Sequence, residues 1–264
     1  MARPVVALLT DFGLRDSYVA EMKGVILSIC PVATIADVSH QIEKFNVRMG
    51  AYVLACAAPY FPRSTVFVAV VDPGVGTRRK AILIQTKQAY FIGPDNGLLA
   101  LAAANQGIER VHEISNKKLL LPEVSNTFHG RDVFAPAAAH LANGTPLADF
   151  GPETRRISTP SFAKIVKKRN MLTGEVLHVD GFGNIVTNIQ KRELDRIDIK
   201  ETLYIRLKST KLKLSLCRAY AEVGRQRPLA IIGSHGFFEV SVNEGNAAEV
   251  FKMRSGDKIT LYRS

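Results

Sequence analysis

Hydrophobic residues in the first 150 positions follow two alternating patterns. Largely apolar runs at 5–10 and 66–71 are typical of strands buried on both faces, whereas 16–28 and 47–58 carry apolar side chains at helical spacing. The same patterns predict further strands at 34–38, 81–86, 89–92 and 110–114, and further helices at 98–104 and 133–141. This alternation predicts an α/β fold, in which a mainly parallel sheet is sandwiched by helices.

The pattern changes from about residue 147. Segment 161–172 follows several proline and serine residues and contains a basic run, so it is interpreted as a linker. Beyond it come short strand-like segments separated by turns, and only 191–196 is expected to be helical. Many short strands with little helix predict a small β-barrel or sandwich. The expected parts are an N-terminal α/β domain at 1–160, the linker, and a C-terminal domain at 173–264.

Composition narrows the class of protein. A hydrophobic content of 47% in 264 residues is enough for a full core. No apolar run approaches the roughly 20 residues that span a bilayer, and the opening residues lead directly into the first strand, so neither a membrane span nor a signal peptide is expected. Cys30, Cys56 and Cys217 are odd in number and far apart, which argues against disulfides or a cysteine-rich metal site. These features predict a cytoplasmic protein.

The net charge of +11 makes nucleic acid a candidate partner. The basic residues, however, concentrate at 164–169 and in 206–213, where they alternate with apolar residues as in a half-buried strand with a solvated face. No helix-turn-helix, zinc-finger or RNP-type aromatic signature accompanies them. A nucleic-acid-binding module therefore stays an alternative that the sequence does not favour.

The first candidate for chemistry is the turn at 71–79, directly after a buried strand. Asp72 stands at the carboxyl end of that strand, where ligands bind in open α/β sheets. Gly74 and Gly76 allow a tight turn and the close approach of a ligand, and Arg79 can return its guanidinium to Asp72. An ordinary turn with a solvated Asp and Arg explains the same residues.

Asp11 ends the first strand and can accept two hydrogen bonds from the vicinal hydroxyls of a ribose. The alternative is a structural Asx-turn. His129 lies in a second polar segment, 127–132, beside Gly130 and before a predicted helix. Asp132 is expected to be the N-cap of that helix. A surface or core histidine without a role is the alternative for His129, and no His or Cys pair has the spacing of a metal site.

The C-terminal half carries two further polar turns. In the first, Phe182 lies between glycines, so its ring can stack on a purine while Asn184 reads the edge of the base and Asp180 stands beside them. A hairpin with a bulge explains the glycines equally well. In the second, Ser234 precedes a strand that carries Glu239 amid apolar neighbours. A buried carboxylate there needs a partner, and an adenine amino group is one candidate.

Together these motifs resemble the S-adenosyl-L-methionine hydroxide adenosyltransferase family, whose relatives include the fluorinases and chlorinases. The resemblance covers nearly the whole chain, and the glycine-rich turn is its most specific part. The motifs that carry it, in order, are LTDFG at 9–13, VDPGVGTRR at 71–79, GPDNGLL at 93–99, FHGRD at 128–132, DGFGN at 180–184 and the segment 233–245.

The resemblance implies a fold, an assembly and a reaction. It implies a C-terminal β-barrel and a homotrimer with active sites between subunits. Water would displace methionine from the 5′ carbon of S-adenosylmethionine, giving adenosine and L-methionine without a cofactor or metal. The implied catalytic residues are Asp72, Arg79 and His129. The implied adenosine contacts are Asp11, Asp72, Asn184, Ser234, Glu239 and the backbone of Val242.

Two departures from the halogenases favour water over halide as the nucleophile. The halogenases resemble this chain but have no carboxylate in the turn at 72–76, and they carry an insertion before 93–96 that this chain lacks. They also have an arginine where His235 stands, so His235 receives no role from the resemblance. Members of the hydrolase family favour the (R)-sulfonium epimer, while halide transfer that forms a 5′-halo-adenosine stays the same-fold alternative.

Overall fold

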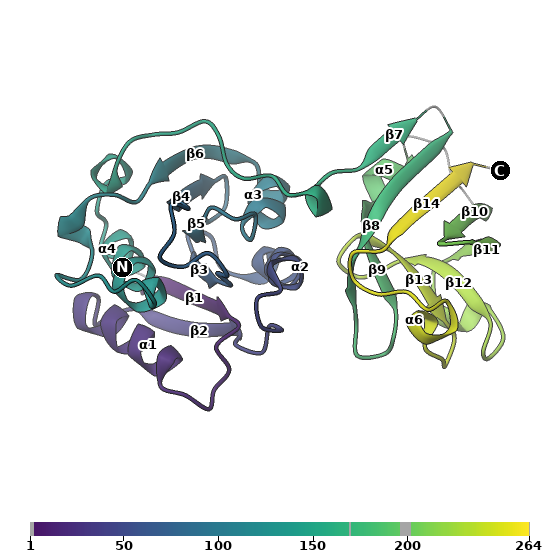
Figure 1. Ribbon diagram of the computed structural model, residues 1–264, viewed down its shortest axis with the longest axis horizontal. Coiled ribbons are helices and arrows are strands. Elements are labelled where there is room, and N and C mark those ends of the chain that lie inside the picture. The colour runs from purple at the N-terminus through teal and green to yellow at the C-terminus, as the bar shows by residue number, and fades with distance from the viewer. Residues whose placement is uncertain (1–2, 169, 196–201, 264) are drawn as a thin grey trace. The chain divides into compact units, whose positions relative to one another are not determined.

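The computed structural model describes residues 3–168, 170–195 and 202–263, and the chain divides between Pro160 and Ser161 into two units (Figure 1). Each unit has a sheet of its own. No helix within the described ranges is both long and apolar enough to cross a membrane.

Six strands form the sheet of the N-terminal unit in the order β2-β1-β3-β5-β4-β6. Their bounds are β1 Val5–Thr10, β2 Thr34–Ser39, β3 Val66–Val70, β4 Ala81–Thr86, β5 Tyr90–Pro94 and β6 Ile108–Glu113. The pairs among β2, β1, β3 and β5 are parallel, and β4 is antiparallel to both β5 and β6. The expected mainly parallel sheet is therefore confirmed, with an antiparallel edge. β4 reverses into β5 because the turn between them is too short for a crossover helix.

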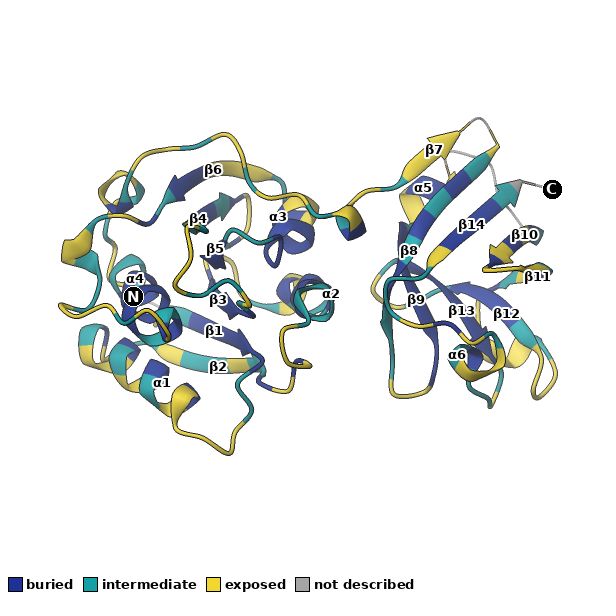
Figure 2. Ribbon diagram, viewed as in Figure 1, coloured by how far each residue is buried: buried dark blue, intermediate teal, exposed yellow. Residues whose placement is uncertain are grey.

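Helices cover both faces of this sheet, as expected. On one face, Val6 and Leu8 of β1 pack with Met22 of α1 and with Ala138 of α4. On the other face, Gly50 of α2 lies against Leu9 and Val71. The central strands β1 and β3 are buried almost throughout, whereas the edge strands β2 and β6 are partly exposed (Figure 2). The helices are α1 Tyr18–Ile29, α2 Val47–Ala57, α3 Ala100–Gln106 and α4 Ala135–Ala142.

The C-terminal unit is a closed β-barrel of seven strands. The order β14-β10-β11-β12-β13-β9-β8 returns to its start because β14 also pairs with β8, and β7 continues the sheet beyond β8. The bounds are β7 Val166–Lys168, β8 Met171–Val179, β9 Ile185–Gln190, β10 Thr202–Leu207, β11 Thr210–Cys217, β12 Pro228–Ile232, β13 Phe237–Val242 and β14 Lys258–Arg263. In β10, Leu203, Ile205 and Leu207 are buried and Arg206 is exposed. The single strand expected at 206–213 is wrong: β10 ends at Leu207 and β11 begins at Thr210, because the chain turns at Lys208, which has a φ of +52°.

Three details differ from the sequence-based expectation. Segment 161–172 is not a linker throughout, because it contains β7 and the start of β8; the exposed lysines of β7 give this strand a linker-like composition. Helix α6, Ala247–Val250, was not expected, because one helical turn is too short to show periodicity. The predicted helix at 191–196 is α5, Lys191–Asp195, and residue 196 lies outside the described ranges. Short 3-10 turns lie at Ala58–Tyr60, Lys117–Leu119, Leu147–Phe150, Ser161–Ala163 and Tyr220–Glu222.

Candidate active site

Asp72 and Arg79 form a nearly buried ion pair beyond the carboxyl end of β3. The turn that carries them closes through the Val75 N–H, which donates to the Asp72 carbonyl at 3.2 Å. Arg79 Nε donates to Asp72 Oδ2 at 2.9 Å, and Arg79 Nη2 donates to the same oxygen at 2.5 Å. The side chains are only 5% and 10% exposed for Asp72 and Arg79, and the guanidinium also lies 5.3 Å from the centre of the Phe134 ring. The predicted return of Arg79 to Asp72 is therefore confirmed, and the pair is not solvated.

The second oxygen of Asp72 is available to another donor. Both hydrogen bonds from Arg79 go to Oδ2, and Oδ1 is buried without a hydrogen-bond partner among the described residues. An unpaired buried carboxylate oxygen is costly, so such an atom calls for a donor such as a water molecule or a ligand hydroxyl. Asp72 can therefore accept a proton or a hydrogen bond at Oδ1 while Arg79 holds Oδ2.

His129 completes the cluster from a different loop. Its Nδ1 lies 2.7 Å from Arg79 Nη2. Because arginine can only donate, Nδ1 must accept this hydrogen bond, and the ring is then neutral with its proton on Nε2. Burial and the charge of Arg79 lower the pKa of His129 below 6.5, against the opposing effects of Asp72, Asp132 and the Ser125 carbonyl. A neutral His129 at neutral pH agrees with this tautomer.

The two loops of the cluster touch through their backbones. Gly76 has a φ of +74°, and a Cβ placed on it would lie 2.3 Å from the Asn126 carbonyl oxygen. Only glycine therefore allows this approach without strain, which explains the second glycine of the turn. Arg79 hydrogen-bonds to both Asp72 and His129, so the structure links the three residues that the family resemblance implied.

Asp11 lies at the carboxyl end of β1, at the same edge of the sheet as Asp72. It is buried, and its Oδ2 accepts the backbone N–H of Phe45 at 2.8 Å. Phe45 has a φ of +63° and a side chain that is 68% exposed. Sequence reasoning missed Phe45. An exposed ring in a strained backbone beside a carboxylate is a surface on which a ribose could lie.

Asp180 organises the first polar turn of the barrel. Its Oδ1 accepts the backbone N–H groups of Phe182 and Asn184, both at 2.9 Å, and its Oδ2 accepts the Asn184 amide at 2.8 Å. The carboxylate therefore holds the turn itself, and the Phe182 side chain stands 83% exposed. Since the Asn184 amide nitrogen is engaged by Asp180, the amide oxygen is the atom left to accept a hydrogen bond from a ligand.

Glu239 lies in β13, close to Asp180. Burial, and then the charge of Asp180, raise its pKa from 4.5 to about 7, although a hydrogen bond from Tyr220 opposes the shift. A Cβ on Gly233 would lie 1.8 Å from Glu239 Oε1, so this glycine makes room for the carboxyl group. Sequence reasoning missed Tyr220, which sits in a short turn between strands and carries no motif.

The remaining expected contacts have simpler surroundings. Ser234 is exposed, and its hydroxyl lies 3.4 Å from His235 Nδ1. The side chain of Val242 is buried and its carbonyl accepts the Gly245 N–H at 3.0 Å. Asp180, Asn184 and Glu239 thus form one polar group on the barrel, with Ser234 next to Gly233.

Asp132 is not the N-cap that the sequence predicted. It lies inside a π-helix, Gly130–Phe134, which runs directly into α4. The helix therefore begins earlier than its apolar periodicity indicates. A π-helix has no sequence signature of its own, so periodicity could not locate this boundary.

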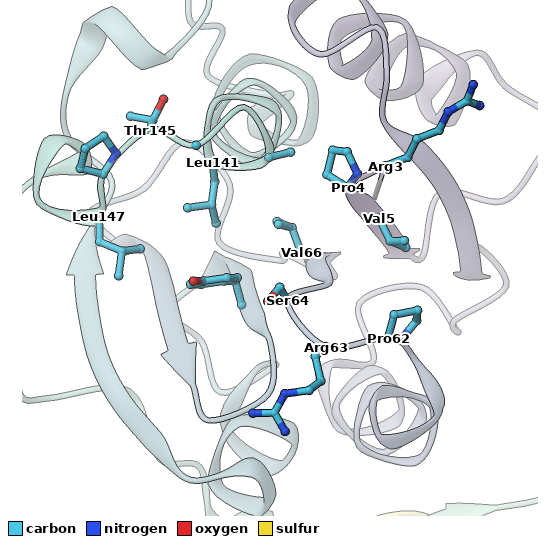
Figure 3. A pocket seen from close by; sticks show the side chains of 14 residues that line it. Arg3, Pro4, Val5, Pro62, Arg63, Ser64, Val66, Leu141, Thr145 and Leu147 are labelled. Carbon is cyan, nitrogen blue, oxygen red and sulfur yellow. The ribbon is translucent and has the colours of Figure 1, made fainter. Parts of the chain in front are cut away.

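A hollow of about 600 Å³ in the N-terminal unit lies away from these residues (Figure 3). It lies at the amino ends of β1 and β3, and Val5, Val66, Leu141 and Leu147 are among the residues that line it. Its lining contains arginines but no carboxylate or imidazole, so it lacks two of the three groups expected for the chemistry. Within the described ranges, no three His, Cys, Asp or Glu side chains gather closely enough to hold a metal ion.

Known proteins of one family are similar to this chain over nearly its whole length. Residues 6–151 match the SAM hydroxide adenosyltransferase N-terminal domain and residues 174–260 match the C-terminal domain of the same name. The (R)-S-adenosyl-L-methionine hydrolase of Salinispora tropica is 38% identical over 264 residues, covering 98% of this chain and 97% of that protein. The hydrolase of the same name from Methanocaldococcus jannaschii is 38% identical over 267 residues, covering 97% and 95%.

More distant relatives and a solved structure extend the comparison. A fluorinase from an Actinoplanes species is 29% identical over 295 residues, covering 99% of this chain and 98% of that protein. A crystal structure of a conserved protein from Thermotoga maritima superposes with a TM-score of 0.87 at 40% identity, covering 98% of this chain and 100% of that one. The chain belongs to the SAM hydroxide adenosyltransferase family.

Proposed function

We propose that the protein is an S-adenosyl-L-methionine hydrolase that forms adenosine and L-methionine and prefers the (R)-sulfonium epimer. The observation that carries this proposal is the Asp72–Arg79–His129 cluster with its unpartnered carboxylate oxygen. The names of the relatives at 37–39% identity support the same substrate and reaction.

The chemistry needs a positioned nucleophile more than it needs an acid. The oxygen of a water molecule attacks the 5′ carbon, the bond from that carbon to sulfur breaks, and its electron pair stays on sulfur as the neutral thioether of methionine. The water proton passes to Asp72 Oδ1. Arg79 keeps the carboxylate in place, and His129, neutral and accepting the Arg79 hydrogen bond at Nδ1, holds that guanidinium against Asp72. Holding the water in line with the leaving sulfur is worth up to about 7–11 kcal/mol.

Substrate binding is assigned to the other polar groups. Asp11 would accept the ribose hydroxyls, with Asp72 close to the reacting end of the sugar. On the barrel, Asn184, Ser234, Glu239 and the Val242 backbone would bind adenosine. Asp180 holds their turn and Phe182 offers a face for stacking.

The test is incubation of the purified protein with each sulfonium epimer, followed by chromatography for adenosine and methionine. We expect both products from the (R) epimer, and no adenosine above the blank would reject the proposal. The mechanism uses no metal or cofactor, so treatment with EDTA should leave the rate unchanged. Added chloride or fluoride should give no 5′-halo-adenosine, because the Asp72 carboxylate repels an anion where the water binds.

Variants separate chemistry from binding. Asp72→Ala and His129→Ala should lose turnover, whereas Asn184→Ala should mainly raise KM. Equal loss of kcat in all three variants would contradict the assigned roles.

The assembly belongs to the same proposal. We expect a homotrimer by light scattering, with each active site built from two copies of the chain. Mixing Asp72→Ala protein with Asn184→Ala protein, after partial dissociation and reassociation, should then raise kcat/KM above that of either variant alone, because some sites receive both intact residues. No recovery in mixed trimers would reject shared sites without touching the assigned reaction.

A further inference from the structure

Asp132 is a fully buried carboxylate that the mechanism above does not use. Its Oδ2 accepts two hydrogen bonds from Ser125, from the backbone N–H at 2.8 Å and from the hydroxyl at 2.6 Å. Its Oδ1 accepts Arg131 Nε at 2.7 Å. Although burial alone would raise the pKa of Asp132, these hydrogen bonds hold it below its usual value, so the group is ionised. An ionised buried carboxylate with three donors is a fixed point in the structure.

Ser125 connects Asp132 to His129. Its hydroxyl accepts the Phe128 N–H at 3.0 Å, which closes the loop directly before His129, and its carbonyl is a hydrogen-bond partner of the imidazole. The next residue, Asn126, is the one whose carbonyl lies against Gly76. The loop that Asp132 holds therefore sets both the imidazole and the approach to the Asp72 turn.

The backbone around Asp132 supports the same role. The Ala135 N–H donates to the Gly130 carbonyl, which gives the wide turn of a π-helix rather than of an α-helix. Such turns are rare in proteins overall, and those that occur are often at functional sites. Here the wide turn lies between His129 and α4, with Asp132 at its centre.

We propose that Asp132 is a positioning residue for His129: through Ser125 it fixes the imidazole that holds Arg79 against Asp72. One chain of hydrogen bonds then runs from Asp132 through Ser125, His129 and Arg79 to Asp72. The kinetic part of this proposal rests on the proposed hydrolase function, and the structural part does not.

The variants are chosen to break this chain at separate points. Asp132→Asn removes the charge at nearly constant volume, and Ser125→Ala removes only the hydroxyl while the backbone N–H of residue 125 still donates to Asp132. The matched control is Glu21→Gln. Glu21 is the other carboxylate that binds Arg131, at 2.8 Å, and its second carboxylate oxygen accepts the Ser17 hydroxyl.

In the kinetic arm, we expect kcat on S-adenosylmethionine to fall on the order of ten- to a hundredfold in Asp132→Asn and Ser125→Ala. KM should stay within about twofold, because none of the adenosine contacts is touched; Glu21→Gln should match the wild type. Unchanged kcat in a folded Ser125→Ala protein, or a loss that appears only in KM, would overturn the proposal.

The second arm needs no substrate and follows the ¹³Cε1 signal of His129 by NMR as pH changes, with His129→Gln used for assignment. The charged groups that face this ring are Arg79, Asp72 and Asp132. Removing the Asp132 charge should move the His129 midpoint to lower pH, and Glu21→Gln should leave it in place. An unchanged midpoint in Asp132→Asn would overturn the proposal even if the protein had another substrate.

Folding is checked by circular dichroism and thermal unfolding for every variant. If Asp132→Asn does not fold, Ser125→Ala decides alone: its His129 signal should broaden or shift because the loop is no longer closed onto Phe128. An unaltered His129 signal together with an unaltered kcat would show that the hydrogen bonds between Asp132 and Ser125 serve folding only, which is contrary to the proposal.

Discussion

Gly76→Ala tests whether contact between the two loops of the catalytic cluster matters. Alanine at a φ of +74° costs about 1–2 kcal/mol from the left-handed backbone alone. In addition, the new Cβ would lie 2.3 Å from the Asn126 carbonyl oxygen, where ordinary contact begins near 3.4 Å. The loops must therefore separate by about 1 Å, a displacement that can lower turnover on the order of a hundredfold.

Gly144→Ala is the matched control for this change. Gly144 also has a positive φ, +90°, but a Cβ there meets nothing within 4 Å and the residue lies away from the cluster. Urea unfolding and the adenosine assay are run on both variants. Both should lose about 1–2 kcal/mol of stability from backbone strain, and only Gly76→Ala should lose kcat. If the two variants behave alike in both measurements, loop contact does not position the cluster.

Three further predictions concern the groups around the site. Because the pKa of Glu239 is raised, the folded state binds its proton more tightly than the unfolded chain does. The free energy of unfolding should therefore fall by at most about 3 kcal/mol as pH rises from about 4.5 to about 7. In urea unfolding at several pH values, Glu239→Gln should flatten this slope. Phe134→Leu removes the ring face under Arg79 while keeping an apolar side chain, so kcat should fall with a loss of about 1 kcal/mol in stability. Asn96→Asp places an oxygen where Asn96 Nδ2 donates to the Val71 carbonyl at 2.9 Å, which should cost about 1–3 kcal/mol and lower kcat through the adjacent Asp72; an unchanged melting temperature would refute this.

The sequence predicted the framework because periodicity and strand ends are local signals. The run before Asp72 is apolar on both faces, and the structure has β3 there with every residue buried. Asp11 and Asp72 were each expected at the carboxyl end of a strand, and because β1 pairs with β3 in parallel, both lie at one edge of the sheet. The meeting of Arg79 with Asp72 followed from seven residues of separation around a glycine turn.

Other features could not be read in this way, because they depend on contacts between distant segments. Phe45 lies beside the site because its backbone N–H donates a hydrogen bond to Asp11, and Tyr220 because it donates a hydrogen bond to Glu239. Asp132 looked like a cap because its role depends on Ser125, seven residues earlier, and on a wide helical turn that no periodicity reveals. The edge strand β7 looked like a linker because its pairing with β8 leaves its lysines in solvent.

The order of strands fixes the span of the segment that joins β3 to β4. Since β5 lies between these strands, residues 71–80 bridge two strand spacings, about 10 Å, over the end of β5. The bridge is tied down from below, where the Asp95 N–H donates to the Lys80 carbonyl at 2.9 Å. Insertions into such a bridge cost little, whereas a deletion of several residues would leave it unable to reach. During evolution this segment can therefore lengthen but not shorten much, so any homologue that keeps this strand order also keeps a connection of similar or greater length across the end of β5.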